Sequence, residues 1–211
     1  MSADWHAIAA RAAQQGIFAP EVILPANSPR AVVDAIVAAD LLPLFVDVQP
    51  GFYVVTWQDF FQAFTERAAA FYVPWTYGNS PEVERIQAAC LTYETQVVEE
   101  RPEDAWDRDA FWALYDRLSA YADRLILPQN TETETEPTWT EFPITARTAE
   151  TAEALREYGL TPAVGNVTRE LDCVWGVAKG CNLSGARTIS KRGFVLPCDP
   201  EAADAVREAL R

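Results

Sequence analysis

The residues best suited to chemistry follow short apolar runs in the first half of the chain. Adjacent carboxylates can bind a cation or act as acid and base, and aromatic rings can stack on a planar ligand. Polar residues that open a helix favour anions such as phosphate. We therefore predict one ligand site, with Glu100 as its weak catalytic candidate; its members are Asn27, Ser28, Trp75, Tyr77, Asn79, Glu99 and Glu100.

Each of these residues also has a structural interpretation, which stays open. The two glutamates can form a solvated strand end that pairs with Arg101. The aromatic and amide residues of the third run can be core and turn residues. Asn27 and Ser28 can simply cap the helix for which Ser28–Pro29 is a start signal.

The remaining reactive residue types are sparse. His6, the single histidine, lies in an amphipathic N-terminal segment, where we expect it to face solvent. A histidine-based triad or metal site therefore has little support. The cysteines form no CxxC pair, so we expect reduced thiols and no metal site; they are Cys90, Cys173, Cys181 and Cys198.

Between residues 21 and 100, short apolar runs alternate with helix-like segments. This rhythm is typical of βαβ units, so we predict an α/β fold with about four parallel strands and flanking helices. Ligands of such sheets lie near the carboxyl ends of the strands, where the candidate residues stand. The four runs are Val22–Leu24, Leu44–Val48, Phe71–Trp75 and Gln96–Glu99.

The second half of the chain has a different pattern. Apolar residues at steps of three or four predict a long helix over residues 103–125. A strand over 138–146 and a helix over 148–158 follow a polar Thr/Glu stretch. We therefore expect an α/β domain over 1–104, a connecting long helix over 105–127, and a small α+β subdomain over 128–211.

Charge and hydropathy exclude several classes of function. The formal net charge is −14, which argues against nucleic acid and anionic membranes as partners. No apolar run is long enough to cross a bilayer, and no export signal is visible at the N-terminus. We therefore expect a cytoplasmic protein with an acidic surface.

Six segments, in order, resemble the DegT/DnrJ/EryC1/StrS family of sugar aminotransferases, which use pyridoxal phosphate (PLP) and have the fold-type I architecture. The resemblance implies a reduced PLP-transferase-like domain and dimers. It also implies that Trp75 stands where the family has the residue stacking on the cofactor, and Glu100 where it has the pyridinium partner. The segments are EVILPANS, LPLFVDVQPGFYVV, AAFYVPWTYGNSPEVERI, TQVVEERPE, TWTEFPITARTAETAEALREYGL and ARTISKRGFVLPCDP.

The departures from the family pattern are equally informative. The phosphate-binding turn and the segment with the Schiff-base lysine have no visible counterpart, and we therefore expect no cofactor. Lys179 is a weak candidate for a replacement lysine, and Lys191 a weaker one on a surface helix.

These observations favour a catalytically inactive relative that acts by binding, as a homodimer or as the partner of an active enzyme. One alternative is a small-molecule binder or enzyme that uses Glu99, Glu100 and Trp75 without a Schiff base. Another is a PLP-dependent sugar aminotransferase that uses Lys179. A strip of Trp106 and Trp112 on the long helix is a candidate interface.

Overall fold

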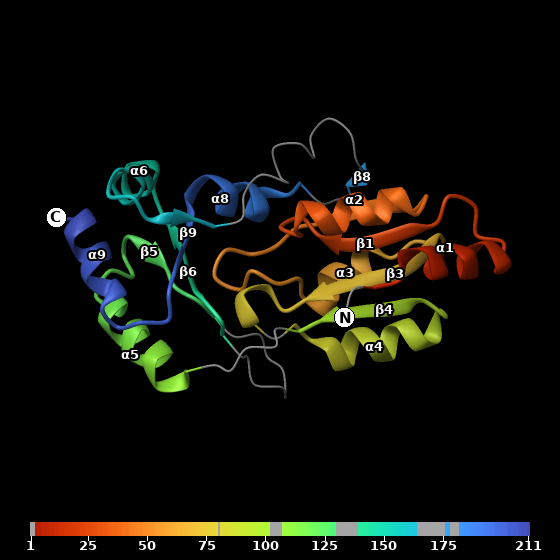
Figure 1. The fold of residues 1–211 in the computed structure, drawn as a ribbon, viewed down its shortest axis with the longest axis horizontal. Helices are drawn as coiled ribbons and strands as arrows, with labels where there is room; N and C mark the ends of the chain where they lie inside the picture. Colours follow the sequence, from red (N-terminus) through yellow and green to blue (C-terminus); the bar gives the residue numbers. More distant parts are fainter. Residues whose placement is uncertain (1–2, 80, 102–106, 130–138, 164–175, 178–181) are drawn as a thin grey trace.

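The computed structural model describes residues 3–79, 81–101, 107–129, 139–163, 176–177 and 182–211. It contains an α/β domain and a smaller subdomain, which lie side by side on the right and left of Figure 1. No described helix is both long and apolar enough to cross a membrane.

The α/β domain is built on a parallel sheet, as the sequence predicts. Its strands run in the order β4-β3-β1-β2-β8, and β1 is completely buried. This confirms the α/β fold and the four predicted strands, to which a short fifth strand is added at the edge. The strands are β1 (Glu21–Pro25), β2 (Leu42–Val46), β3 (Ala68–Pro74), β4 (Gln96–Glu100) and β8 (Gly176–Val177).

Helices cover both faces of this sheet. Phe71 and Tyr72 are neighbours on β3 and therefore point to opposite faces. Phe71 packs against Phe60, whereas Tyr72 packs against Trp5, so α3 and α1 lie on opposite sides. The helices are α1 (Trp5–Gln14), α2 (Arg30–Ala38), α3 (Trp57–Ala63) and α4 (Val83–Thr92), with a 3-10 turn η1 (Thr76–Gly78).

The smaller subdomain is an antiparallel sheet covered by helices. Its strands run in the order β5-β6-β9-β7 and enclose a second apolar core. The strands are β5 (Leu125–Ile126), β6 (Phe142–Ala146), β7 (Thr161–Pro162) and β9 (Gly193–Leu196), and the helices are α5 (Arg108–Ser119), α6 (Ala149–Glu157), α8 (Ser184–Arg192) and α9 (Ala202–Ala209).

The predicted long helix over 103–125 is wrong at its C-terminal end. The helix α5 ends at Ser119, and Leu125 lies in strand β5. Residues 102–106 lie outside the described part of the chain. Phe111, Leu114 and Leu118 of α5 pack into the core of the small subdomain. The apolar periodicity therefore reflects contact with that core.

Hydrogen bonds to Asp47, which directly follows β2, join the two domains. The Asp47 carboxylate, just after β2, accepts hydrogen bonds from the Gly185 and Ala186 backbone N–H groups at 2.9 and 2.8 Å. It thereby satisfies free donors at the N-terminus of α8. Gly185 is required here, since a Cβ atom would lie 1.9 Å from the Val48 carbonyl oxygen.

Candidate functional site

The predicted ligand site lies where the strand order reverses. The chain leaves β1 toward β2 on one side, and leaves β3 toward β4 on the other. In open α/β sheets the crevice outside this switch point is the usual ligand site. Asn27 and Ser28 follow β1, and Trp75, Tyr77 and Asn79 follow β3, so the structure places both groups at the two sides of this crevice.

The loop after β2 crosses between the two groups and is held by both. Asn27 Nδ2 donates to the Tyr53 carbonyl oxygen at 2.9 Å. Asn79 Nδ2 donates to the Phe52 carbonyl oxygen at 2.5 Å and to that of Gln129 at 3.0 Å. The two predicted amides therefore fix the loop in place.

The side chain of Tyr53 fills the space beneath this loop. Tyr53 has no exposed surface and meets the Tyr77 ring edge-on, with 5.5 Å between the ring centroids. Its hydroxyl shares a hydrogen bond of 2.7 Å with Thr145 Oγ1 of β6. Burial raises the pKa of Tyr53, so the phenol stays neutral. In this arrangement Tyr77 makes an edge-to-face contact with another ring of the protein itself.

Glu99 and Trp75 are bound to each other. Trp75 Nε1 donates to Glu99 Oε1 at 2.9 Å, and Arg101 pairs with the same oxygen. The Arg101 guanidinium also lies 4.6 Å from the centre of the Trp75 ring, a cation–π distance. One face of the indole is thus covered by Arg101, which matches the structural interpretation of Glu99.

Glu100 points to the opposite face of the sheet, as successive residues of a strand do. Its carboxylate accepts a hydrogen bond from the hydroxyl of Tyr72. Burial, followed by the contact with Glu100, raises the pKa of Tyr72. Because Glu99 and Glu100 face different sides and have different partners, they do not form a joint acid and base pair.

Three oxygens around the crevice are buried without a hydrogen-bond partner: Asn27 Oδ1, Ser28 Oγ and Asn79 Oδ1. The interpretation of Ser28 as the helix cap is wrong, because Pro29 is extended and α2 begins at Arg30. Buried unpaired oxygens are rare in proteins. They mark the crevice as the least satisfied polar region among the described residues.

The other candidates lie away from the crevice or outside the described residues. His6 is exposed on α1, as predicted, and Trp112 is partly exposed on α5. Cys90 and Cys198 are free thiols. Lys179, Trp106, Cys173 and Cys181 fall on residues that the structure does not describe. No cluster of metal ligands occurs within the described ranges.

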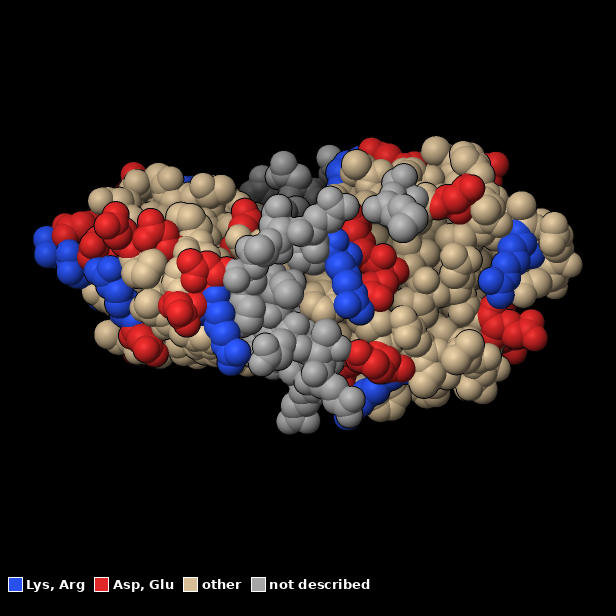
Figure 2. Space-filling model, turned by 60° about the horizontal axis from the view of Figure 1, so that its bottom comes forward, with Lys and Arg blue, Asp and Glu red and all other residues tan. Residues whose placement is uncertain are grey.

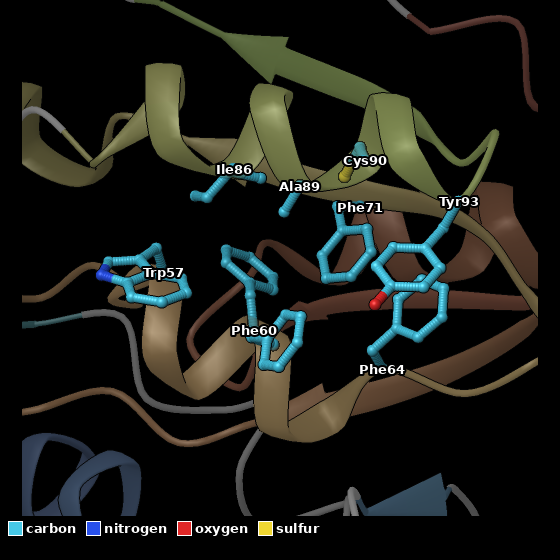
Figure 3. A pocket seen from close by; sticks show the side chains of 9 residues that line it. Trp57, Phe60, Phe64, Phe71, Ile86, Ala89, Cys90 and Tyr93 are labelled. Atoms are coloured by element: carbon cyan, nitrogen blue, oxygen red, sulfur yellow. The ribbon is translucent and has the colours of Figure 1, made fainter.

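An aromatic slot between α3 and α4 was not anticipated from the sequence. Figure 3 shows Trp57, Phe60 and Phe64 facing α4 across the slot, with Tyr93 closing one end. Its free volume is about 10 Å³, which is no more than one water molecule needs. Phe61 and Tyr93 line the slot and are each 48% exposed. It is therefore a packed surface and not a ligand cavity.

Comparison with known proteins decides the family. The model of the DegT/DnrJ/EryC1/StrS aminotransferase family matches residues 6–106. These residues belong to that family. The sequence-based resemblance is thus confirmed over the α/β domain. A search of curated proteins finds no match.

Solved structures share the fold over nearly the whole chain. GDP-4-keto-6-deoxy-D-mannose-3-dehydratase from E. coli, with bound hydrated PLP, superposes with a TM-score of 0.73 at 13% identity, covering 98% of this chain and 85% of that one. The aminotransferase TlmJ from Streptoalloteichus hindustanus gives 0.73 at 13% identity, covering 98% and 83%. DesV from S. venezuelae, in complex with a ketimine intermediate, gives 0.70 at 17% identity, covering 99% and 83%.

The prediction that no cofactor is expected is therefore wrong. Two of the solved structures that share the fold contain PLP, and the described residues do not show that the cofactor site is absent. Trp75 and Glu100, for which the resemblance implies a role in holding the cofactor, lie at neighbouring strand ends. Arg101 contacts one face of Trp75, and Tyr72 donates a hydrogen bond to Glu100.

Sequence reasoning missed Asp47, Tyr53 and Tyr72, whose side chains bind the start of α8, Thr145 and Glu100, respectively. A signal was present for Tyr72: a phenol inside an otherwise apolar strand requires a polar partner. A carboxylate at the end of the next strand can supply it. Tyr53 and Asp47 form hydrogen bonds with residues of the small subdomain, and no pattern in the sequence predicts those contacts.

Proposed function

We propose that this member of the DegT/DnrJ/EryC1/StrS family acts by binding a second protein chain and not by transamination. The partner in the first instance is a second copy of the same chain. Whether the protein also holds PLP is a separate question, which the proposal does not require.

The proposal rests on one observation: the polar residues of the crevice already form hydrogen bonds with other parts of the protein. Asn27 and Asn79 hold the loop after β2, and Tyr53 fills the space below it. Glu99 and Trp75 are paired with each other. Turnover at this crevice requires groups that are free to contact a substrate. Within the described residues, these groups stabilise the fold instead.

The surface around the aromatic slot provides a means of binding. Phe61 and Tyr93 are half exposed, and their ring centroids lie 6.5 Å apart. Single exposed apolar residues are common, but a group of large ones is typical of interfaces. Figure 2 shows a broad area of uncharged side chains on the side of the α/β domain.

Two features favour a second copy as the partner. Two chains of net charge −14 repel each other least where they meet through uncharged side chains. A two-fold axis would place the same apolar group of both chains face to face. In addition, β4 pairs only with β3 among the described strands, and Val97 and Val98 are half-buried. Such an open edge is a usual place for association.

The test is the mass of the purified protein by light scattering after size exclusion. We expect a dimer, and we expect Phe61→Glu to give monomers with an unchanged far-UV circular dichroism spectrum. Phe18→Glu is the matched control, since Phe18 is 88% exposed and lies outside this surface. A protein that is monomeric at all concentrations and captures no aminotransferase would refute the proposal.

A small-molecule ligand in the crevice is the second candidate, and the three unpaired oxygens favour it. For such a ligand to enter, the loop held by Asn79 would have to move. A ligand that raises the melting temperature of the wild type but not of Glu100→Gln would support this alternative.

A further inference from the structure

Two open features of the described residues lie outside the crevice. One is the groove between α6 and α8 of the small subdomain, which has a volume of about 420 Å³ and a basic lining of Arg156, Arg187, Lys191 and Arg192. The other is the edge of the parallel sheet along β4. The backbone and the charges of this edge identify a partner that fits it.

β4 is the least covered of the four longer strands in the parallel sheet. It forms the margin of the sheet in Figure 1, and it pairs only with β3 among the described strands. None of its residues is buried, whereas β1 is buried throughout. Val97 and Val98 are half-buried and pack against the apolar core. The edge therefore presents apolar side chains together with backbone groups.

The direction of each backbone group of β4 follows from one hydrogen bond. The Glu100 carbonyl oxygen accepts a bond from the Trp75 backbone N–H, so the backbone groups of Glu100 face β3. These directions alternate along a strand, and Val97 and Glu99 therefore point their N–H and C=O groups outward. Outside the sheet, no described residue bonds to these groups. They are available to another strand.

We propose that two copies of the chain pair antiparallel along β4, with the two-fold axis at Val98, so that their parallel sheets join into one continuous sheet. The inference rests on the proposed function and names the edge at which the copies meet. In this register Val97 of each copy exchanges N–H···O=C bonds with Glu99 of the other. Every outward backbone group of these two residues is then paired, and the Val98 side chains meet at the axis.

Side-chain charges favour this register over its neighbours. It sets the Gln96 amide, which can donate, opposite the exposed residue Glu100. It sets Val97 opposite Glu99, whose carboxylate is paired with Arg101. An axis at Glu99 would place two carboxylates directly opposite each other, which is destabilising. An axis at Val97 would leave Glu99 and Glu100 opposite residues outside β4.

Acidic residues can also protect an edge strand against pairing. In β4 both of them stand at the carboxyl end, so an antiparallel partner presents the neutral residues Gln96 and Val97 to them. A parallel partner would place carboxylates side by side. The charges therefore exclude other alignments and permit the proposed one.

The edge adjoins the apolar surface that contains Phe61 and Tyr93. Tyr93 ends α4 shortly before β4 begins, and its ring contacts that of Phe61. Antiparallel pairing brings this end of β4 next to the carboxyl end of β4 in the second copy. The same two-fold contact can therefore include the edge and the aromatic surface.

Cysteine crosslinking tests the position of the axis. Val98→Cys places two thiols opposite each other in a non-hydrogen-bonded pair, where side chains lie closest. We expect oxidised glutathione to convert this variant to a covalent dimer on a non-reducing gel. Val97→Cys is the matched control, because Val97 lies opposite Glu99 and should crosslink far less. The wild type, which has the same native cysteines, gives the background.

A proline substitution tests the backbone bonds. Val97→Pro removes an outward N–H group and leaves the bonds between β4 and β3 in place. Val97→Ala is the control, since it shortens the side chain but keeps the N–H group. We expect Val97→Pro to dimerise roughly tenfold more weakly than Val97→Ala in sedimentation equilibrium, with the same far-UV circular dichroism spectrum.

The outcomes separate this inference from the proposed function. A wild-type dimer without preferential crosslinking of Val98→Cys, or equal dimerisation of Val97→Pro and Val97→Ala, would overturn the edge pairing alone. A wild type that is monomeric at all concentrations but captures an aminotransferase would also overturn the edge pairing alone. A monomer that captures none would overturn both.

Discussion

The crevice of the α/β domain and the groove of the small subdomain make opposite use of polar residues. In the crevice, the polar side chains bind one another and the loop after β2, and Tyr53 fills the space. In the groove, basic side chains line a volume of about 420 Å³ that no described side chain fills. The crevice lies at the position that is usual for ligands of open α/β sheets, whereas the groove has the larger open volume and the basic lining.

This difference shows that the position of a site and its availability are separate properties. The strand order fixes where the crevice lies, because helices leave β1 and β3 in different directions. Its availability depends on what the connecting loops do. Here the residues between β2 and α3 place Phe52 and Tyr53 against Asn79 and Asn27.

The largest effect is expected from a substitution at the contact between the α/β domain and α8 of the small subdomain. Gly185→Ala would place a Cβ atom 1.9 Å from the Val48 carbonyl oxygen and push α8 off Asp47. We expect a loss of about 3 kcal/mol in the free energy of unfolding in urea.

The matched control is Ser184→Ala, one residue earlier in α8. It removes only a hydrogen bond of 3.4 Å to Asp47. We expect its unfolding free energy to fall by no more than about 1 kcal/mol. Equal losses in the two variants would show that the close approach at Gly185 does not hold the domains together.

A smaller effect on stability is expected at Tyr53, which fills the space in the crevice. Because the pKa of Tyr53 is raised, the folded protein keeps the phenol proton at pH values where the unfolded chain releases it. This contribution to stability is complete below about pH 10 and is lost as the pH rises above it. Tyr53→Phe should therefore make the alkaline fall in the urea midpoint shallower, although it costs about 1 kcal/mol at neutral pH.

Tyr158→Phe is the control for this experiment, since Tyr158 is 50% exposed on the small subdomain. Its alkaline fall in the urea midpoint should match that of the wild type. An unchanged fall in Tyr53→Phe would mean that the Tyr53 hydroxyl is not buried against Thr145.

The parallel sheet could be predicted from the sequence because its signal lies within short stretches of the chain. Continuous apolar runs such as Leu44–Val48 need cover on both faces, which is the signature of a parallel sheet. The helix over 103–125 was predicted too long for a related reason. Its periodicity continues to Leu125, but that residue joins β5, whose pairing with β6 cannot be seen from local spacing.

The placement of the candidate side chains after the strands was predicted, but the partners of these side chains were not. The side chains after β1, β3 and β4 lie where we expected them, yet their partners come from other parts of the chain. Asn79 is held against Gln129, and Tyr53 against Thr145. The groove could not be predicted at all, because Arg156 and Arg187 meet across it only after the small subdomain folds.

The central claim is that the chain binds without turnover, and a single-turnover assay tests it most directly. The purified protein is incubated with PLP and L-glutamate, the amino acid trapped with PLP in one structural relative. We predict no 2-oxoglutarate above a control without protein. Formation of 2-oxoglutarate in amounts equal to the protein, lost in Lys179→Ala, would contradict the account.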